Sequence, residues 1–86
     1  MSKVIIYGAS YCVFCIKAKN FLSSKNVPLT WINVEEEEGQ AKLLQLHKQY
    51  NWKTIPMIFV EDKFIGGYTE MMKEIKNRNI VLDDLM

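Results

Sequence analysis

The stretch KVIIYGASYCVFCIKAKNFL, residues 3–22, decides the fold of this chain. Its first part, residues 3–7, is a short apolar run of β-branched and aromatic side chains, which predicts a buried strand. After Gly8-Ala9-Ser10 the apolar positions recur at helical spacing, at Cys15, Ala18, Phe21 and Leu22. The stretch therefore predicts a strand that passes directly into a helix, and the helix ends near residues 23–26, before Pro28.

The rest of the chain continues this alternation of strands and helices. Residues 29–34 predict a second strand rich in β-forming residues. The acidic run at residues 35–38 is interpreted as the loop and first turn of a second helix, because carboxylates there face the positive end of the helix dipole. Four positions of that helix fall at i, i+3, i+4 and i+7 and are expected on its inward face: Leu43, Leu46, His47 and Tyr50.

The last part of the chain predicts a hairpin and a third helix. Residues 57–61 and 63–65 are two short strands around Asp62. Thr69 follows a pair of glycines and is expected to cap a helix whose apolar residues are Met71, Met72 and Ile75. The order β-α-β-α-β-β-α predicts an α/β fold with one parallel strand pair joined by a crossover and a late antiparallel hairpin.

Length and composition limit the classes of function. A chain of 86 residues is expected to form a single domain, residues 1–86, with a modest core. The formal net charge of +1 and the scattered lysines argue against a nucleic-acid-binding protein. The apolar runs are only strand-sized, so we expect no targeting segment and no membrane association. These observations predict a cytoplasmic protein, in a reducing compartment where a permanent disulfide is disfavoured.

Both cysteines of the chain lie in the segment SYCVFC, residues 10–15. They could form a structural disulfide, contribute half of a metal site, or act as a redox pair. The compartment and the small loop between them disfavour a structural disulfide. A protein-only zinc site lacks ligands, because the chain adds only His47 to its two cysteines. C-x-x-C beside a strand–helix–strand pattern is typical of a redox pair.

The position of the pair supports redox chemistry. Cys12 is expected where a strand ends and a helix begins, so its sulfur meets unpaired backbone N–H groups and the positive end of the helix dipole. Both features stabilise a thiolate, which is the nucleophilic form of cysteine. Cys15 lies one turn later on the same face and further inside. We therefore predict that Cys12 is the nucleophile and Cys15 is the resolving thiol.

Three ordered motifs resemble those of the glutaredoxin family, small dithiol oxidoreductases with the thioredoxin fold. They are C-x-x-C after the first strand, Thr54-Ile55-Pro56 before the third strand, and the segment IGGYTE, residues 65–70, before the last helix. The resemblance covers nearly the whole chain, which is similar to the short bacterial-type members. It implies a central four-stranded mixed sheet flanked by three helices, and glutathione-dependent thiol–disulfide oxidoreductase activity.

The resemblance also implies how the site is used. Glutathione is the reductant and co-substrate, with no obligatory metal, and Cys12 forms a mixed disulfide with it. Thr54 and Ile55, which precede a cis peptide bond to Pro56, pair their backbone with the tripeptide. Thr69 and Glu70 hold the γ-glutamyl end at the helix N-terminus, Tyr68 flanks it, and the glycine pair before them allows close approach of the backbone. The residues expected to bind glutathione are Phe14, Lys53, Thr54, Ile55, Pro56, Gly67, Tyr68, Thr69 and Glu70.

The chain departs from the family pattern around Cys12. Val13 and Phe14 replace the usual proline and tyrosine, which loosens the helix start and removes a hydroxyl near the sulfur. Family members often carry Lys or Arg a few residues before the first cysteine, in contact with the glycyl carboxylate of glutathione. Here that stretch is Gly8-Ala9-Ser10, and Lys53 is expected to take over the contact. Tyr11 is bulkier than the small residue usual at its position.

The expected partners are glutathione and proteins that carry a disulfide or a glutathione mixed disulfide, ribonucleotide reductase among them, and the chain is expected to act as a monomer. Two alternatives stay open. The first is a redoxin reduced by thioredoxin reductase; such redoxins often have Val after the first cysteine, as at Val13, but usually lack the IGGYTE element. The second is a [2Fe-2S] carrier, in which two subunits each give Cys12 and two glutathione thiolates complete the ligand set.

Overall fold

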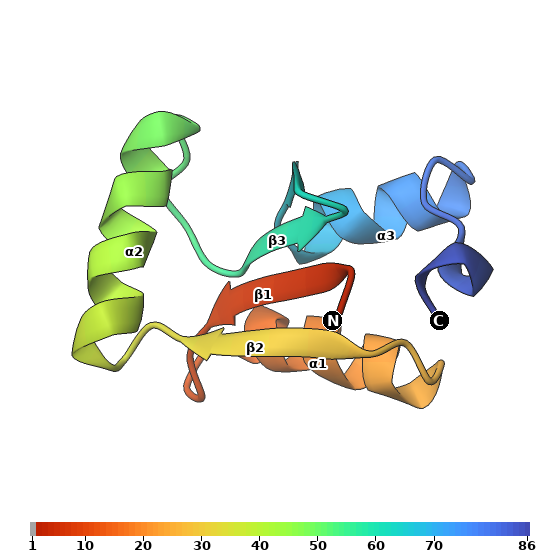
Figure 1. Ribbon diagram of the computed structural model, residues 1–86, viewed down its shortest axis with the longest axis horizontal. Coiled ribbons are helices and arrows are strands. Elements are labelled where there is room, and N and C mark those ends of the chain that lie inside the picture. The colour runs from red at the N-terminus through yellow and green to blue at the C-terminus, as the bar shows by residue number, and fades with distance from the viewer. Residues whose placement is uncertain (1) are drawn as a thin grey trace.

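The structure is a computed structural model and describes residues 2–86; Met1, the first residue of the predicted domain, lies outside the described residues (Figure 1). The elements are β1 (Val4–Gly8), α1 (Val13–Ser24), β2 (Leu29–Asn33), α2 (Glu37–Gln49), β3 (Met57–Val60), β4 (Lys63–Gly66), α3 (Tyr68–Lys76) and a 3-10 helix, η1 (Leu82–Leu85). The predicted order of strands and α-helices is confirmed, and the strands shift by a single residue at their ends. The short helix η1 was not predicted from the sequence.

The four strands form one mixed sheet in the order β2-β1-β3-β4. β1 and β2 are parallel, with Gly8 opposite Asn33, whereas β3 is antiparallel to β1, with Met57 opposite Tyr7. β1 and β2 therefore end on the side of the sheet where β3 begins, and we call these strand ends the thiol end. Figure 1 shows α2 standing across it. The opposite strand ends, with the β3–β4 turn and η1, are called the hairpin end.

The two faces of the sheet bury different side chains, because successive strand residues point to opposite sides. Val4 and Ile6 of β1 pack into an aliphatic cluster with residues of α1 and α3, including Leu22 and Met71. Tyr7 faces the other side and packs into the cluster that contains Leu46 of α2. Helices α1 and α3 thus cover one face and α2 the other, as the predicted fold requires. Within residues 2–86, no helix has the length and apolar character needed to cross a membrane.

Two expectations about helix positions are wrong in detail. The N-cap of α3 is Gly67, not Thr69, which is an exposed residue inside the first turn. Tyr50 is the C-cap of α2 and remains 37% exposed rather than facing inward, with its ring beside those of Phe59 and Phe64 at centroid distances of 5.5 and 4.9 Å. Aromatic packing on the strand surface, which helical periodicity does not report, determines its position.

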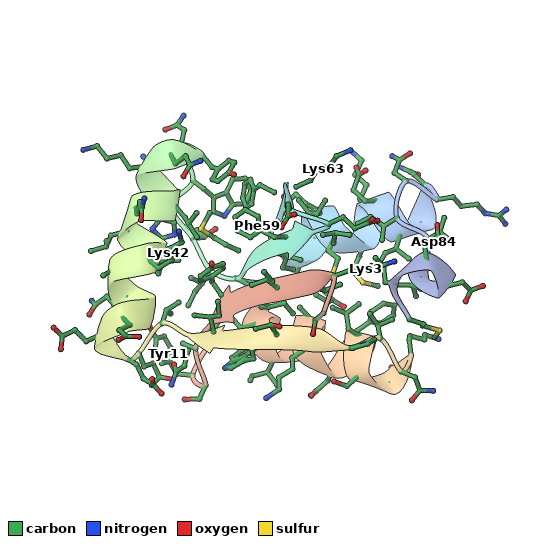
Figure 2. All side chains as sticks on the ribbon, viewed as in Figure 1. Lys3, Tyr11, Lys42, Phe59, Lys63 and Asp84 are labelled. Carbon is green, nitrogen blue, oxygen red and sulfur yellow. The ribbon has the colours of Figure 1, made fainter. Side chains whose placement is uncertain are left out.

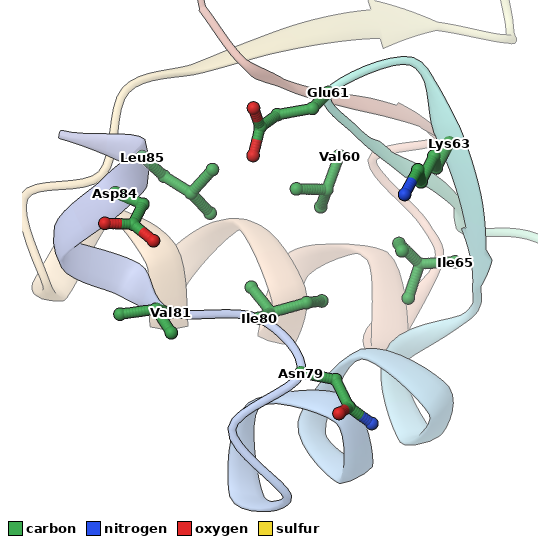
Figure 3. Close-up of a pocket in the computed structure, with 9 residues that line it drawn as sticks. All are labelled: Val60, Glu61, Lys63, Ile65, Asn79, Ile80, Val81, Asp84 and Leu85. Carbon is green, nitrogen blue, oxygen red and sulfur yellow. The ribbon is translucent and has the colours of Figure 1, made fainter.

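The hairpin end contains a hollow of about 340 Å³ (Figure 3). Its floor is aliphatic and includes Ile80 and Leu85, which are 8% and 3% exposed. The side chains of Glu61, Lys63 and Asp84 stand around it. The Lys3 ammonium holds η1 in place by donating to the Asp84 carbonyl oxygen at 2.7 Å. None of the predicted site residues lines this hollow.

Candidate active site

Cys12 occupies the N-cap of α1, as predicted from the junction of strand and helix. Its backbone is extended, with φ −91° and ψ 112°, and its half-buried Sγ accepts a hydrogen bond from the Cys15 N–H at 3.2 Å. The Sγ of Cys12 also lies 3.8 Å from the Ile55 carbonyl oxygen, which can accept the thiol proton. A sulfur held by a helix N-terminal N–H and open on one side is suited to act as a nucleophilic thiolate.

Cys15 is enclosed, and this distinguishes it from Cys12. Its side chain is 0% exposed. The end of β1 lies directly against it, since a Cβ built on Gly8 would stand 3.1 Å from the Cys15 Sγ and 2.7 Å from Cη2 of Trp31. Burial raises the pKa of the Cys15 thiol to about 12, and its hydrogen bond with the Cys12 side chain adds to this effect. Cys15 is therefore kept as a protonated thiol while Cys12 is free.

The segment before β3 forms the wall opposite the nucleophile. The Ile55–Pro56 peptide bond is cis, as the resemblance implied. The Thr54 carbonyl oxygen lies 3.0 Å from Nε2 of His47. Because a carbonyl only accepts, the ring donates from Nε2, and α2 fixes the loop in this way. His47 was predicted as a partly buried helix residue, which is confirmed, but its contact with Thr54 was not foreseen.

The start of α3 forms the second wall. The Glu70 carboxylate turns back and accepts a hydrogen bond from the Gly67 N–H at 2.8 Å. The N–H groups of Tyr68 and Thr69 lie in the first turn, where no intrahelical acceptor exists. The Tyr68 ring lies 5.8 Å from the Phe14 ring, centroid to centroid, which links α3 to the start of α1.

The predicted site residues fall into two groups around Cys12. Lys53, Thr54 and Ile55 line a hollow beside the sulfur together with Tyr11, and Figure 2 shows Tyr11 next to α2. Gly67 lies on the other side of Pro56, since a Cβ built on it would stand 3.6 Å from the Pro56 carbonyl oxygen. The second group consists of Gly67, Tyr68 and Phe14, and the rings of the last two pack against each other. The side chains of Lys53, Thr69 and Glu70 are exposed.

Glu35 contributes to the site and was missed from the sequence. Its Oε1 accepts hydrogen bonds from the Ser10 N–H at 2.8 Å and from the Ser10 hydroxyl at 2.7 Å, and these bonds lower the pKa of the Glu35 carboxyl. The contact ties the loop before Cys12 to the end of β2. The signal was available, because parallel neighbouring strands end at the same edge of a sheet, so Ser10 and Glu35 had to lie near one another.

The described part of the chain contains no set of side chains that could bind a metal ion by itself. Among residues 2–86, no group of three or more His, Cys, Asp or Glu side chains comes together in an arrangement that could hold a metal ion. His47, the one histidine, is engaged with Thr54. The chemistry that the arrangement itself supports is thiol–disulfide exchange at the Cys12 sulfur.

Comparisons with known proteins agree with this geometry. The family model for glutaredoxin matches residues 4–65. Glutaredoxin 1 of Rickettsia conorii is 36% identical over 64 residues, which are 74% of this chain and 63% of that protein, so the match spans less than two thirds of the relative's length.

Solved structures share the fold. The dithiolic glutaredoxin 2-C-Grx1 of Trypanosoma brucei brucei superposes with a TM-score of 0.83 at 27% identity, over 98% of this chain and 86% of that one. The buckwheat glutaredoxin–glutathione complex reaches a TM-score of 0.88 at 22% identity, over 98% and 79%, a likeness that concerns the fold alone. The sheet order, the helices and the paired cysteines agree with these matches, and the chain belongs to the glutaredoxin family.

Proposed function

We propose that this chain is a glutathione-dependent thiol–disulfide oxidoreductase in which Cys12 is the nucleophile. One observation carries the proposal, the inequality of the two thiols. Cys12 Sγ lies at the N-terminus of α1 with an N–H donor at 3.2 Å and one side open, whereas Cys15 is 0% exposed. Family membership supports the same assignment.

In the proposed cycle on a glutathionylated protein, the Cys12 thiolate attacks the glutathione sulfur. The protein–glutathione disulfide breaks, the Cys12–glutathione disulfide forms, and the protein leaves as a thiolate that takes up a proton. A second glutathione thiolate then attacks the glutathione sulfur, which releases Cys12 and glutathione disulfide. Each complete turnover consumes one glutathione thiol, and the disulfide passes from the protein to glutathione, because the other half of the glutathione disulfide comes from the substrate.

A protein disulfide follows the dithiol route. Cys12 attacks one sulfur of the protein disulfide and forms a mixed disulfide, while the other protein sulfur leaves as a thiolate. Cys15 then loses its proton and attacks the Cys12 sulfur, which closes the Cys12–Cys15 disulfide and releases the first protein sulfur as a thiolate. Two glutathiones reduce the Cys12–Cys15 disulfide. With a Cys15 pKa of about 12, only about one thiol in 10⁵ is ionised at pH 7 before the first step. The cycle on a glutathionylated protein does not use Cys15, so it does not depend on this ionisation.

Charge and backbone groups suggest how glutathione lies. Its γ-glutamyl end carries both an ammonium and a carboxylate, which suits the start of α3, where free N–H groups stand beside the Glu70 carboxylate. Its glycyl end carries only a carboxylate, which suits the Lys53 ammonium. We propose that the tripeptide spans these two points across the segment Thr54-Ile55-Pro56. Its partners in this proposal are disulfide-bonded or glutathionylated proteins of the reducing cytoplasm.

The test is reduction of the mixed disulfide of glutathione and cysteine, with glutathione and glutathione reductase as the electron source. We expect rapid turnover in the native chain and in Cys15→Ser, and no turnover in Cys12→Ser. Thioredoxin reductase is supplied in a parallel assay. Turnover with thioredoxin reductase but none with glutathione would replace this proposal with a redoxin fed by that enzyme.

A further inference from the structure

We propose that the surface between the cysteine loop and α2 selects protein disulfides in which an apolar residue follows the attacked cysteine. The inference rests on the function proposed above and names its substrate class. The surface is a groove of about 460 Å³, and we call it the α2 groove; its lining includes the apolar side chains of Tyr11, Leu43, Leu44 and Ile55 and the polar side chains of Gln40 and Lys53.

The α2 groove adjoins the nucleophile. Ile55 is a wall of the groove, and its carbonyl oxygen lies 3.8 Å from the Cys12 Sγ. Tyr11 is the residue directly before Cys12 and forms another wall. A peptide joined to Cys12 through its own cysteine can therefore place a residue next to that cysteine in the groove.

Five of the residues that line the groove are apolar, and two of these five are open to water. Tyr11 is 74% exposed and Leu44 is 62% exposed, although α2 already packs against the sheet through Leu46, which is 6% exposed. Single exposed apolar residues are common on protein surfaces and need no explanation. Here two of them face one groove beside a nucleophile, and covering them would release apolar surface from water.

The charges at the two ends of glutathione fix the direction in which a peptide bound to Cys12 runs. In the proposed site the γ-glutamyl end of glutathione lies at the start of α3, so the glycyl end points to Lys53 and the α2 groove. In a polypeptide the glycyl carboxylate is replaced by an amide and the chain goes on, so the contact with the Lys53 ammonium loses its charge. An apolar side chain against Leu44 and Tyr11 replaces it. Glutathione and protein substrates thus depend on different residues at the same end of the site.

The experiment is a thiol exchange equilibrium in the Cys15→Ser chain. Its Cys12–glutathione disulfide is mixed with a short peptide thiol, so that the peptide displaces glutathione; one disulfide breaks, one forms and no net oxidation occurs. Three capped peptides are compared: Gly-Cys-Leu, Gly-Cys-Ser and Leu-Cys-Gly. Mass spectrometry of the intact protein gives the ratio of the two mixed disulfides.

We expect Gly-Cys-Leu to be favoured about five- to tenfold over both other peptides, the effect of covering one apolar side chain in part. Leu44→Gln keeps helix propensity and removes the apolar wall, so the preference should fall to about onefold. Leu44→Met should retain it. Val81→Asn removes a comparably exposed apolar side chain at the hairpin end and should change nothing. Lys53→Gln should weaken glutathione relative to all three peptides alike.

Several results would overturn the inference. Equal affinity for Gly-Cys-Leu and Leu-Cys-Gly would show that the peptide does not enter the groove with the residue after its cysteine. An unchanged preference in Leu44→Gln would remove the groove from substrate choice. A dimer in sedimentation that Leu44→Gln dissociates would mark the groove as a contact between two copies. Failure of Cys12 to form a disulfide with glutathione or any peptide would instead refute the proposed function itself.

Discussion

At the hairpin end the hollow has an aliphatic floor and a charged rim, whereas at the thiol end the hollows are bounded partly by main-chain groups. The Ile55 carbonyl and the Cys15 N–H lie beside the nucleophile, and His47 holds the carbonyl of Thr54, the residue before Ile55. In the hairpin-end hollow, the described lining residues include no cysteine or histidine. A hollow with an aliphatic floor and a charged rim therefore does not mark the active site, whereas fixed backbone groups around a partly open sulfur do.

The thiol end depends on close backbone packing, and Gly39→Ala should break it with the largest effect. A Cβ on Gly39 would stand 2.0 Å from the Asn33 carbonyl oxygen and 2.8 Å from the Asn33 carbonyl carbon, so α2 would have to move away from the end of β2. We expect a loss of about 3 kcal/mol in the free energy of unfolding. Urea denaturation followed by tryptophan fluorescence measures it.

Gly67→Ala is the matched control at the same end of the sheet. Its Cβ would meet the carboxylate oxygen of Glu70 at 3.2 Å, and this flexible side chain can shift. We expect a loss below about 1 kcal/mol. Equal losses in the two variants would show that the packing of α2 against the end of β2 is looser than the structure has it.

Substitutions at the hairpin end should lower the free energy of unfolding without changing turnover. Leu85 of η1 is 3% exposed and packs in the aliphatic cluster. We expect Leu85→Ala to cost about 2 kcal/mol of unfolding free energy through the cavity it leaves, and Leu85→Met to cost less. Turnover of the glutathione–cysteine disulfide, measured well below the melting temperature, should stay unchanged. A parallel fall in turnover would mean that the hairpin end is coupled to the active site at the thiol end.

The buried thiol gives the thiol end a pH dependence. The fold raises the pKa of Cys15 from 9.0 to about 12, so above pH 9 the unfolded chain ionises this thiol while the folded chain keeps it protonated. Its contribution to stability is complete below pH 9 and is lost as the pH rises toward 12. Between pH 9.5 and 10.5 we expect the native chain to lose about 1 kcal/mol more than Cys15→Ala does. Denaturant midpoints at both pH values give the difference, and equal losses would contradict the assignment.

The order of elements was predictable because each signal is local. The apolar run before Gly8, the helical spacing after it and the hairpin around Asp62 all depend on neighbours in the sequence. The placement of Cys12 at a helix start followed in the same way. The contacts of Glu35 with Ser10 and of His47 with Thr54 join different elements, and they needed the strand register and the position of α2. The cap at Gly67 was missed because an N-cap side chain was expected, whereas here the Glu70 carboxylate reaches back instead.

The smallest expected effect comes from Glu35, because its hydrogen bonds concern only the loop before Cys12. The hydrogen bonds from Ser10 lower the pKa of the Glu35 carboxyl below 4.5, so the contact should persist at neutral pH and be lost as the pH falls through that lowered value. The Ser10 amide proton should therefore titrate in NMR spectra with a midpoint below 4.5. In Glu35→Gln this titration should vanish, whereas in Glu61→Gln, which removes an exposed carboxylate at the hairpin end, the Ser10 titration should stay unchanged. A Ser10 midpoint at or above 4.5 would mean that the loop is not held by this carboxylate, and the backbone around Cys12 would then be ordered by the cysteine turn alone.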